Sequence, residues 1–385
     1  MQKNISFFIC FILFFFSCHS KKKITPDSYS IKPTETQLVF PLDDKTQIYI
    51  FSLHIYNDVD GEEYLVFQNQ SYPQLLFYNI KTQQLYKKID CAYEGPDAVP
   101  SFGGFFVKNM NEIYVTNVNQ DGLSMIDGEG KPIHIYKNKT KKGETIHTNT
   151  ASNPKSIPVI NNKLYLPLSL NREYGEDVKF QKSNLCATLD LETQELKLLP
   201  LTYFAISERE GDDLIVLYYS RCTNGKQFVY SFHESEDIFV TDLEHTTLKR
   251  IKVKSKYLPH LKFKPQKFTM AGPNNCINVE TPHYGAILHD SYRKVYYWIA
   301  HPKAEIEKGI NCLELDMMGG KNFSIIVLNE DFEIIGETLM PDYTYNPKLC
   351  FVRTDGLYIS ESHVLNPNFD ENKLCFRRFE LVKKK

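Results

Sequence analysis

A repeated unit of short apolar strands and polar turns constrains the fold of this 385-residue chain more than any other feature. In each unit an apolar strand is followed by Asn or Asp, a short polar turn and a second apolar strand. Asn and Asp favour such positions because their side chains accept hydrogen bonds from the backbone of the turn. The pattern predicts five β-hairpins, and the residues that open their turns are Asn79, Asp127, Asp190, Asp242 and Asn329.

Another short apolar strand precedes each hairpin, and the unit recurs about every 50 residues, which is typical of a β-propeller blade. These strands are residues 63–69, 111–118, 162–169, 227–232 and 294–300, with a sixth at 355–362. The last unit lacks one hairpin arm, which the N-terminal strand at residues 36–42 can supply, so that no sheet edge stays exposed. The sequence therefore predicts an all-β fold, a single propeller of six blades over residues 35–385, closed by its N-terminal strand.

Two alternatives to this architecture stay open. The interval between Asp242 and Asn329 is long enough to hold a seventh blade. We interpret it as one blade with inserted loops, because residues 257–273 carry scattered Pro and Lys. A β-sandwich or two smaller β domains would also suit a chain with 24 Tyr and 26 Phe, since aromatic residues favour strands. Helical periodicity is scarce, which argues against an α/β fold.

The first residues of the chain have the pattern of an export signal. Lys3 precedes an apolar run at residues 5–16, which is too short for a membrane span of about 20 residues but suits the apolar region of a signal peptide. Ser17 is the small residue that a lipoprotein signal peptidase needs before Cys18, although Phe15 stands where Leu is usual. We predict a signal peptide at residues 1–17, a lipidated Cys18 and a flexible tether over residues 18–34. A plain signal anchor and a secretory peptide are the alternatives.

Charge and cysteine content exclude some function classes. A net charge of −2 argues against a nucleic-acid partner. Seven cysteines remain after Cys10 and Cys18, which is an odd number, and no two are close in sequence. An exported protein can hold disulfides, but we expect most of these cysteines to be small buried apolar side chains. They are Cys91, Cys186, Cys222, Cys276, Cys312, Cys350 and Cys375.

With its units aligned, the chain resembles a family of uncharacterised Bacteroidetes lipoproteins that carry a domain of unknown function. Three segments carry the resemblance: Glu94-Gly95-Pro96, the sequence FGGFF at residues 102–106, and HDSYRKVYY at residues 289–297. The resemblance implies a six-bladed propeller and a lipid anchor, and it implies no reaction. Family members often carry Arg after the paired tyrosines, where this chain has Trp298. Basic residues after Cys18 favour a periplasm-facing anchor over one on the outer-membrane surface.

The sequence contains no recognisable catalytic or metal-binding motif. It has no nucleophile elbow, phosphate-binding loop or zinc-binding helix. Asp58 resembles the start of a calcium loop, but the twelfth residue from it is Asn69, so we interpret the segment as a solvated turn. The acidic run HESED at residues 233–237 is interpreted as a loop. No catalytic residue, cofactor or metal is therefore predicted.

Ligands of propellers commonly bind where loops converge on the central channel. By position we predict that six residues can bind a ligand there, because Arg beside Tyr can hold an anionic or sugar-like group. These residues are Arg172, Tyr174, Arg221, His283, Tyr284 and Arg293. The alternative is that they pack adjacent blades together.

The function predicted from the sequence is that of a non-enzymatic binding module of the cell envelope. Its membrane contact is the lipid on Cys18, and its partner is an envelope protein or a carbohydrate ligand. A hydrolase or lyase that acts on a lactone or glycan is the alternative. The preference for binding rests on analogy between propellers and on the missing motifs.

Overall fold

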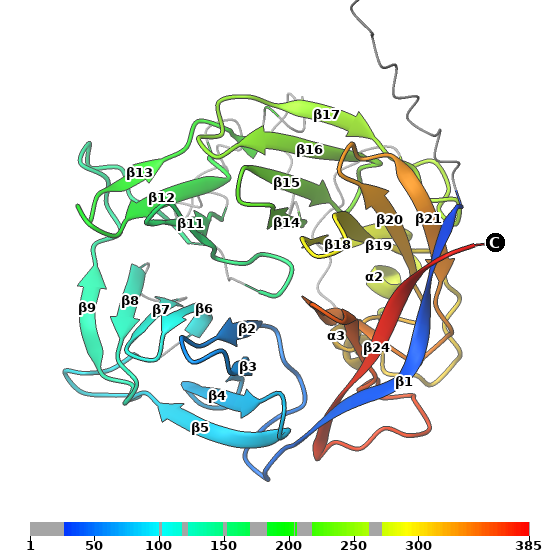
Figure 1. Cartoon of the computed structure of the whole chain (residues 1–385), viewed down its shortest axis with the longest axis horizontal. Helices are drawn as coiled ribbons and strands as arrows, with labels where there is room; N and C mark the ends of the chain where they lie inside the picture. The colour runs from blue at the N-terminus through cyan, green and yellow to red at the C-terminus, as the bar shows by residue number, and fades with distance from the viewer. Residues whose placement is uncertain are drawn as a thin grey trace, which may run out of the picture.

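The computed structural model describes residues 27–99, 102–117, 122–148, 152–169, 183–203, 205, 218–261 and 272–384. These residues form an all-β, propeller-like fold in which the sheets stand around a common centre (Figure 1). Four sheets have four strands each and a fifth has eight. The predicted all-β, propeller-like class is confirmed, whereas Cys18 and the predicted signal peptide lie outside the described residues.

Each four-stranded sheet is antiparallel, and its strands follow one another in chain order. The first comprises β2 (Leu53–Asn57), β3 (Glu63–Asn69), β4 (Gln74–Asn79) and β5 (Gln84–Asp90). The second comprises β6 (Phe102–Asn109), β7 (Glu112–Asn117), β8 (Gly122–Ile126) and β9 (Pro132–Tyr136). The third comprises β10 (Val159–Ile160), β11 (Lys163–Pro167), β12 (Cys186–Asp190) and β13 (Leu196–Leu198). The fourth comprises β14 (Tyr219–Thr223), β15 (Gln227–Phe232), β16 (Asp237–Asp242) and β17 (Lys249–Lys252).

The eight-stranded sheet joins the two ends of the chain. Its order is β18-β19-β20-β21-β1-β24-β23-β22. The N-terminal strand pairs antiparallel with β24 over nearly its whole length, as predicted, and meets β21 at a single parallel pair, Tyr29 with Gly336. It begins within the segment predicted as tether. The bounds are β1 (Tyr29–Pro41), β18 (His283–Asp290), β19 (Val295–His301), β20 (Ser324–Asn329), β21 (Ile334–Leu339), β22 (Asn346–Arg353), β23 (Gly356–Ser360) and β24 (Lys373–Lys383).

The five predicted hairpins are confirmed, with the turn chemistry that the sequence indicates. The Asp127 carboxylate accepts hydrogen bonds from the backbone N–H groups of Glu129 and Lys131, both at 2.9 Å. The side-chain oxygens of the other four turn-opening residues accept corresponding backbone bonds. A turn in which a side chain replaces backbone acceptors reverses the chain at a fixed place and so sets the register of both strands.

One strand of each unit was not predicted. The strands predicted to precede the hairpins, together with the sixth at residues 355–362, are β3, β7, β11, β15, β19 and β23, and each pairs with a further strand at the edge of its sheet. These additional strands are β2, β6, β10, β14, β18 and β22. Figure 1 shows four of them, β2, β6, β14 and β18, on the central side of their sheets. The centre of the molecule is therefore lined by residues that the sequence pattern left outside the repeated unit.

Both faces of the sheets are buried, because each sheet packs between two neighbours. In β3, Tyr64 and Val66 join a cluster with residues of the second sheet, such as Phe105. The alternate residues Leu65 and Phe67 face the other way, into a cluster that contains side chains of β1 and β24. Successive side chains of a strand point to opposite faces, so a strand buried on both faces is a continuous apolar run.

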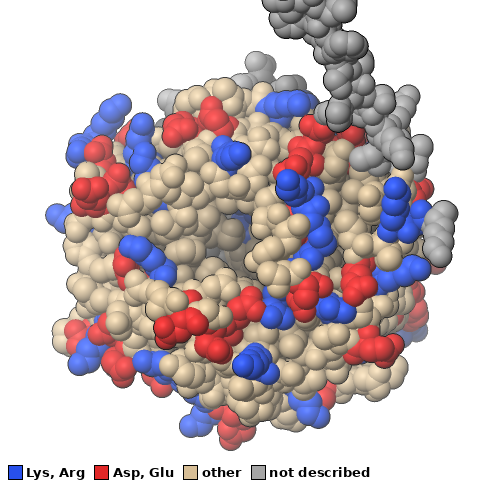
Figure 2. Space-filling model, in the orientation of Figure 1, with Lys and Arg blue, Asp and Glu red and all other residues tan. Residues whose placement is uncertain are grey.

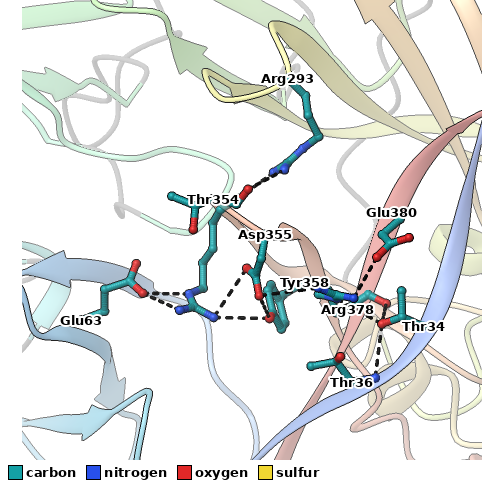
Figure 3. A network of polar contacts seen from close by, with 10 residues as sticks. Thr34, Thr36, Glu63, Arg293, Thr354, Asp355, Tyr358, Arg378 and Glu380 are labelled. Atoms are coloured by element: carbon teal, nitrogen blue, oxygen red, sulfur yellow. Dashed lines mark hydrogen bonds and ion pairs between the residues drawn. The ribbon is translucent and has the colours of Figure 1, made fainter.

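Polar contacts join the first sheet to the eight-stranded sheet (Figure 3). Arg353 forms an ion pair with Glu63 of β3, with Nη2 and Oε2 2.5 Å apart. Tyr358 lies 3.3 Å from the same guanidinium and donates a hydrogen bond to Asp355 at 2.8 Å. Arg378 contacts β1 through the Thr34 hydroxyl at 3.2 Å. The ends of the chain are thus held by side chains as well as by strand pairing.

Two short helices flank β18 and β19, and a disulfide joins them. The helices are α2 (Ile277–Glu280) and α3 (Cys312–Met317), and the bond links Cys276 to Cys312. Among the described residues between Asp242 and Asn329, the inserted elements are these helices and their loops. Of the remaining five cysteines, four are buried and Cys375 is half-buried, so most are the small buried side chains that were expected.

Candidate functional site

A cavity of about 300 Å³ lies where three of the unpredicted central strands, β14, β18 and β22, come together. One face of the molecule is hollowed at its centre (Figure 2). Among the described residues, the cavity wall contains two lysines, three histidines and no Asp or Glu. The lining residues are Ile50, Phe51, Ser152, Pro154, Lys155, Tyr218, Tyr219, Ser220, His233, His283, Gly285, Ala286, Ile299, His301, Pro347 and Lys348.

Residues 152–156, here named the crossing segment, run across this centre and fasten three sheets together. The Asn153 backbone N–H donates to the Phe51 carbonyl at 3.0 Å, and its side-chain amide donates to the Cys350 carbonyl at 2.8 Å. The Pro154 carbonyl accepts a hydrogen bond from the Arg221 backbone N–H at 2.8 Å. Because its backbone is held on both sides, the segment carries Lys155 into the cavity on a fixed support.

One wall of the cavity is a column of four stacked rings. His283 lies at its middle, with ring centroids 4.4 Å from His301 and 5.1 Å from His233. The column continues from His233 to Tyr218 at 5.3 Å. The planes of neighbouring rings differ by 14° to 29°. Because the rings are stacked nearly parallel, their edges and ring nitrogens point to the sides of the column. Each ring therefore offers the cavity an aromatic edge and its own hydrogen-bonding positions.

The three imidazoles are neutral at neutral pH. Burial lowers the pKa of His233, His283 and His301, and for His233 and His301 positively charged neighbours lower the pKa further. The Nδ1 atom of His283 lies 2.9 Å from the Thr281 carbonyl oxygen. Since that oxygen can only accept, Nδ1 carries the proton of the neutral ring and Nε2 keeps its lone pair.

Lys155 is a half-buried cation without an acidic partner among the described residues. Burial lowers the pKa of its ammonium group to about 8, and the nearby Arg221 guanidinium also contributes. Its Nζ lies 5.3 Å from the centroid of the Tyr219 ring, a favourable but weak contact. A poorly solvated charge without a counter-ion costs free energy, so the place of Lys155 in a cavity wall calls for an explanation.

The second lysine of the cavity is compensated. The Nζ atom of Lys348 lies 3.0 Å from a carboxylate oxygen of Asp316 and donates to the Asp316 carbonyl at the end of α3. Burial opposes the charged form of Asp316, but Lys348 outweighs it and lowers the pKa of this carboxyl below its usual value. The uncompensated positive charge of the cavity is therefore that of Lys155, with Arg221 behind it.

The structure places Arg221 and Tyr284, two residues predicted to bind ligand, inside the protein. The Arg221 guanidinium donates to the carbonyls of Ser156 and Tyr165, at 3.0 and 2.8 Å, and so joins the crossing segment and the third sheet to β14. Tyr284 is fully buried and stacks on Trp298 with centroids 4.1 Å apart. The terminal nitrogens of Arg221 and the hydroxyl of Tyr284 are bonded within the fold, which is the packing role considered as the alternative, whereas the Nε of Arg221 has no partner among the described residues.

The remaining predicted residues are distributed differently. His283 lies in the cavity wall. Arg293 forms an ion pair with Asp290 at 2.5 Å and donates to the Thr354 carbonyl at 3.0 Å, across the junction between β18–β19 and β22–β23 (Figure 3). Arg172 and Tyr174 lie outside the described residues.

Of the lysines and histidines in the cavity wall, four were not predicted: Lys155, His233, His301 and Lys348. Of these only His233 stood in a segment that attracted attention, the HESED run. The acids of that run do not join it, because Glu236 instead accepts hydrogen bonds from His260 and from the Leu261 backbone. The other three have no local signal, since their residue types are common in loops and at strand ends.

Within the described part of the chain, no group of three or more His, Cys, Asp or Glu side chains is arranged to hold a metal ion. Asp58 lies in the turn between β2 and β3, where its carbonyl accepts a hydrogen bond from Gly61 at 3.0 Å. None of the described helices is long and apolar enough to span a membrane.

Comparison with known proteins identifies the family. Residues 28–339 match the model of a domain of unknown function, DUF4221. A crystal structure of a DUF4221 member from Bacteroides vulgatus is 31% identical, with a TM-score of 0.82 over 94% of this chain and 100% of the other. A Bacteroides fragilis protein whose name describes it as exported shares the fold at 10% identity, with a TM-score of 0.52 over 92% and 96% of the two chains. No curated protein matches the sequence significantly. This chain belongs to the DUF4221 family.

Proposed function

We propose that this protein is an exported, lipid-anchored, six-bladed β-propeller that binds a small ligand at its centre without transforming it. The blade number follows if the eight-stranded sheet is divided at its weakest seam, the single pair between β1 and β21. Each half then has four strands, like the other four sheets. Export and anchoring rest on the apolar run before Cys18, and the B. fragilis protein of the same fold, whose name describes it as exported, agrees with export.

The observation that carries the binding proposal is the central cavity itself. It lies at the low end of the volumes that hold small molecules, and its wall has a mostly apolar surface with a few fixed polar groups. The crossing segment and the ring column are held by hydrogen bonds and stacking before any ligand arrives. A rigid site loses little conformational entropy on binding, which favours affinity.

The absence of a described carboxylate in the cavity wall favours binding over glycoside hydrolysis, which uses a pair of carboxylates. The hydrolase or lyase alternative retains one favourable observation, the neutral imidazoles. A neutral imidazole can accept a proton, and His283 presents an Nε2 lone pair. The two proposals therefore differ in whether a bound compound leaves unchanged.

Thermal unfolding of the purified full chain in detergent, with a panel of anionic, neutral and cationic small molecules and oligosaccharides, tests the binding proposal. A compound that raises the unfolding temperature in a concentration-dependent way, and that mass spectrometry recovers unchanged, supports it. Recovery of a cleaved or eliminated product would establish the enzyme instead. Loss of the stabilisation in a His233→Leu variant locates the ligand in the cavity.

The anchor is tested separately. Cys18→Ala should abolish labelling by a radioactive or clickable fatty acid and should either release the protein or stall it at the inner membrane with its signal peptide uncleaved. The matched control is Cys10→Ala, which alters a cysteine inside the predicted signal peptide and should leave the labelling intact. Unchanged labelling of the Cys18→Ala protein contradicts the lipid anchor but leaves the cavity proposal untouched.

A further inference from the structure

We propose that the ligand of the central cavity is a small ring-bearing carboxylate, with its carboxylate on Lys155 and its ring against the histidine column. This inference rests on the proposed binding function and specifies the chemistry of the ligand. It is carried by two features of the same cavity, a cation without a counter-ion and a wall of stacked rings.

The charge balance of the site is the first step. Lys348 is balanced by Asp316, at 3.0 Å. Lys155 has no carboxylate within ion-pair distance among the described residues, and Arg221 behind it is bound by the Ser156 and Tyr165 carbonyls rather than by an acid. The cavity thus has a local excess of positive charge on a half-buried group, and a bound anion would supply the missing partner.

The support of Lys155 is the second step. The backbone N–H of Lys155 donates to the Ser152 carbonyl at 2.8 Å, and residue 155 bridges to Arg221 of β14. The backbone of Lys155 is therefore fixed, and its side chain reaches into the cavity from a fixed Cα position. An ammonium group is a compact point charge, which suits one carboxylate without requiring the forked geometry that Arg provides.

The ring column determines the rest of the ligand. The faces of His233, His283 and His301 are engaged by one another, so the column presents its ring edges to the cavity. Ring edges carry partial positive charge and favour the π-face of an aromatic ligand in an edge-to-face contact. Ile50, Ile299 and the other apolar lining residues complete an apolar pocket for the ring of the ligand. A cavity of about 300 Å³ has room for a single ring with short substituents, rather than for a long oligosaccharide.

Gly285 shows that close packing at this wall is required. A Cβ atom at this position would lie 3.1 Å from Nε2 of His301 and 3.3 Å from Ile299, tighter than ordinary contacts. A side chain here would displace the end of the column. The column and the cavity floor are therefore fitted together, and His301 has little room to move away from a ligand.

The experiment measures calorimetric affinity of the full chain for four probes: 4-hydroxybenzoate, its neutral amide 4-hydroxybenzamide, cyclohexanecarboxylate and acetate. We expect 4-hydroxybenzoate to bind most tightly, the amide about 10- to 100-fold more weakly because the charge-assisted bond is lost, and acetate weakest. Cyclohexanecarboxylate has the charge without the aromatic face, and its affinity should lie between those of 4-hydroxybenzoate and acetate.

Three variants test the roles of the named residues. Lys155→Gln should reduce 4-hydroxybenzoate affinity to that of the amide and leave amide binding unchanged, whereas Lys155→Arg should retain most of the preference for the acid. Lys226→Gln is the matched control, because this exposed lysine lies in the turn at the opposite end of β14 and β15. His283→Leu should weaken the two aromatic probes and not acetate.

Equal binding of acid and amide, or acid binding that survives Lys155→Gln, overturns this inference. If in that case another compound still stabilises the protein through the cavity, the proposed binding function stands and only the ligand class is wrong. If no compound of the wider panel binds, the binding function itself fails. Should Lys155→Gln not fold, the acid–amide difference and the Lys155→Arg protein still decide the question.

Discussion

Lys155 illustrates at the scale of one residue how a ligand site can be recognised without a motif. A buried ammonium group normally has a carboxylate partner or gives up its proton, because the charged form is poorly solvated. Lys155 has a lowered pKa and no described acidic partner. The protein therefore tolerates the free-energy cost of a poorly solvated ammonium group, and an anionic ligand would remove that cost. Arg221, buried beside it, donates from Nη2 to two carbonyl oxygens, although its Nε has no partner among the described residues, and these bonds give it a structural explanation.

The first prediction concerns the pH dependence of binding. Lys155 has a pKa near 8, so it is charged at pH 7 and mostly neutral at pH 9. A carboxylate ligand stays ionised throughout, Arg221 stays charged, and the imidazoles of His233, His283 and His301 stay neutral. Affinity for benzoate, which unlike 4-hydroxybenzoate has no phenol to titrate in this range, should therefore fall by about tenfold from pH 7 to pH 9, as measured by calorimetry.

The control for this prediction is benzamide, which has no group that titrates over this range and whose affinity should not change. The ligand-free protein should show the opposite trend in stability. Because the unfolded chain binds the Lys155 proton up to its ordinary pKa of 10.5, stability should rise between pH 8 and pH 10.5. An acid affinity that is constant up to pH 9 would show that Lys155 does not hold the anion.

The second prediction assigns Arg221 a role in stability. Arg221→Met keeps much of the apolar volume but leaves the carbonyl oxygens of Ser156 and Tyr165 without their donor inside the protein. We expect the free energy of unfolding to fall by about 2–4 kcal/mol, measured by urea denaturation. Arg250→Met is the control, because its ion pair with Asp237 is partly exposed and should be worth less than about 1 kcal/mol. Equal losses would contradict the role given to Arg221.

The candidate site could be predicted only in part because its residues come from separate sheets. His283 was selected by its place before a predicted strand, and it lies in the cavity. Lys155 and His301 are more than a hundred residues apart, and each stands in a stretch without distinctive composition. Only the ring of sheets brings them together, so spacing along the chain carries no sign of their proximity.

At the scale of elements, the hairpins were predictable and the central strands were not. The hairpin strands are buried on both faces and so form continuous apolar runs between turns that Asn or Asp opens. The central strand β14 has the sequence YSRCT, because one side of it faces the cavity and the crossing segment. Polar residues that line a centre look like loop residues in the sequence. The central strands that line the cavity, β14, β18 and β22, are therefore strands that the hydrophobic pattern of the sequence does not reveal.

The third prediction tests the joint between β1 and β21. A Cβ atom on Gly336 would lie 2.2 Å from the Tyr29 carbonyl oxygen, so any side chain must force the two strands apart. Gly336→Ala should lower the free energy of unfolding by about 1–3 kcal/mol, measured by denaturant titration. Gly272→Ala is the control, since no described atom lies within 4 Å of its added Cβ. A stability equal to that of the parent would mean that β1 can move from β21 without cost.

At the scale of the whole molecule, the fold depends on contacts between the two ends of the chain. Ten paired positions hold β1 to β24, and the Glu63–Arg353 ion pair holds the first sheet to the last. The side chains of Leu38 and Phe40 on β1 lie in the same apolar cluster as Leu65 and Phe67 of β3. The wall of the central cavity includes Phe51, directly before β2 of the first sheet, and Lys348 of β22 in the eight-stranded sheet. We therefore expect the cavity to keep its shape only while this closure holds.

The fourth prediction uses a cysteine that the chain already has at the closure. Val39 of β1 lies directly opposite Cys375 of β24, and both side chains are half-buried. The backbone N–H of Val39 donates to the Gln83 side chain and that of Cys375 donates to Ser362, so neither bonds to the facing strand. Such a pair brings the Cα atoms to about 4.5 Å, within the range of a disulfide. Val39→Cys should therefore form a disulfide with Cys375.

That bond would close almost the whole domain into one covalent loop, and long loops give the largest restriction of the unfolded chain. We expect the oxidised Val39→Cys protein to gain about 3–5 kcal/mol in unfolding free energy and to melt at a higher temperature. The parent with and without reductant is the reference, because reduction also opens the Cys276–Cys312 bond. Val39→Ser separates the effect of the substitution from that of the bond. If mass spectrometry shows the new disulfide and the melting temperature does not rise, the opening of the ring between β1 and β24 is not an early step of unfolding, and stability is limited at another seam.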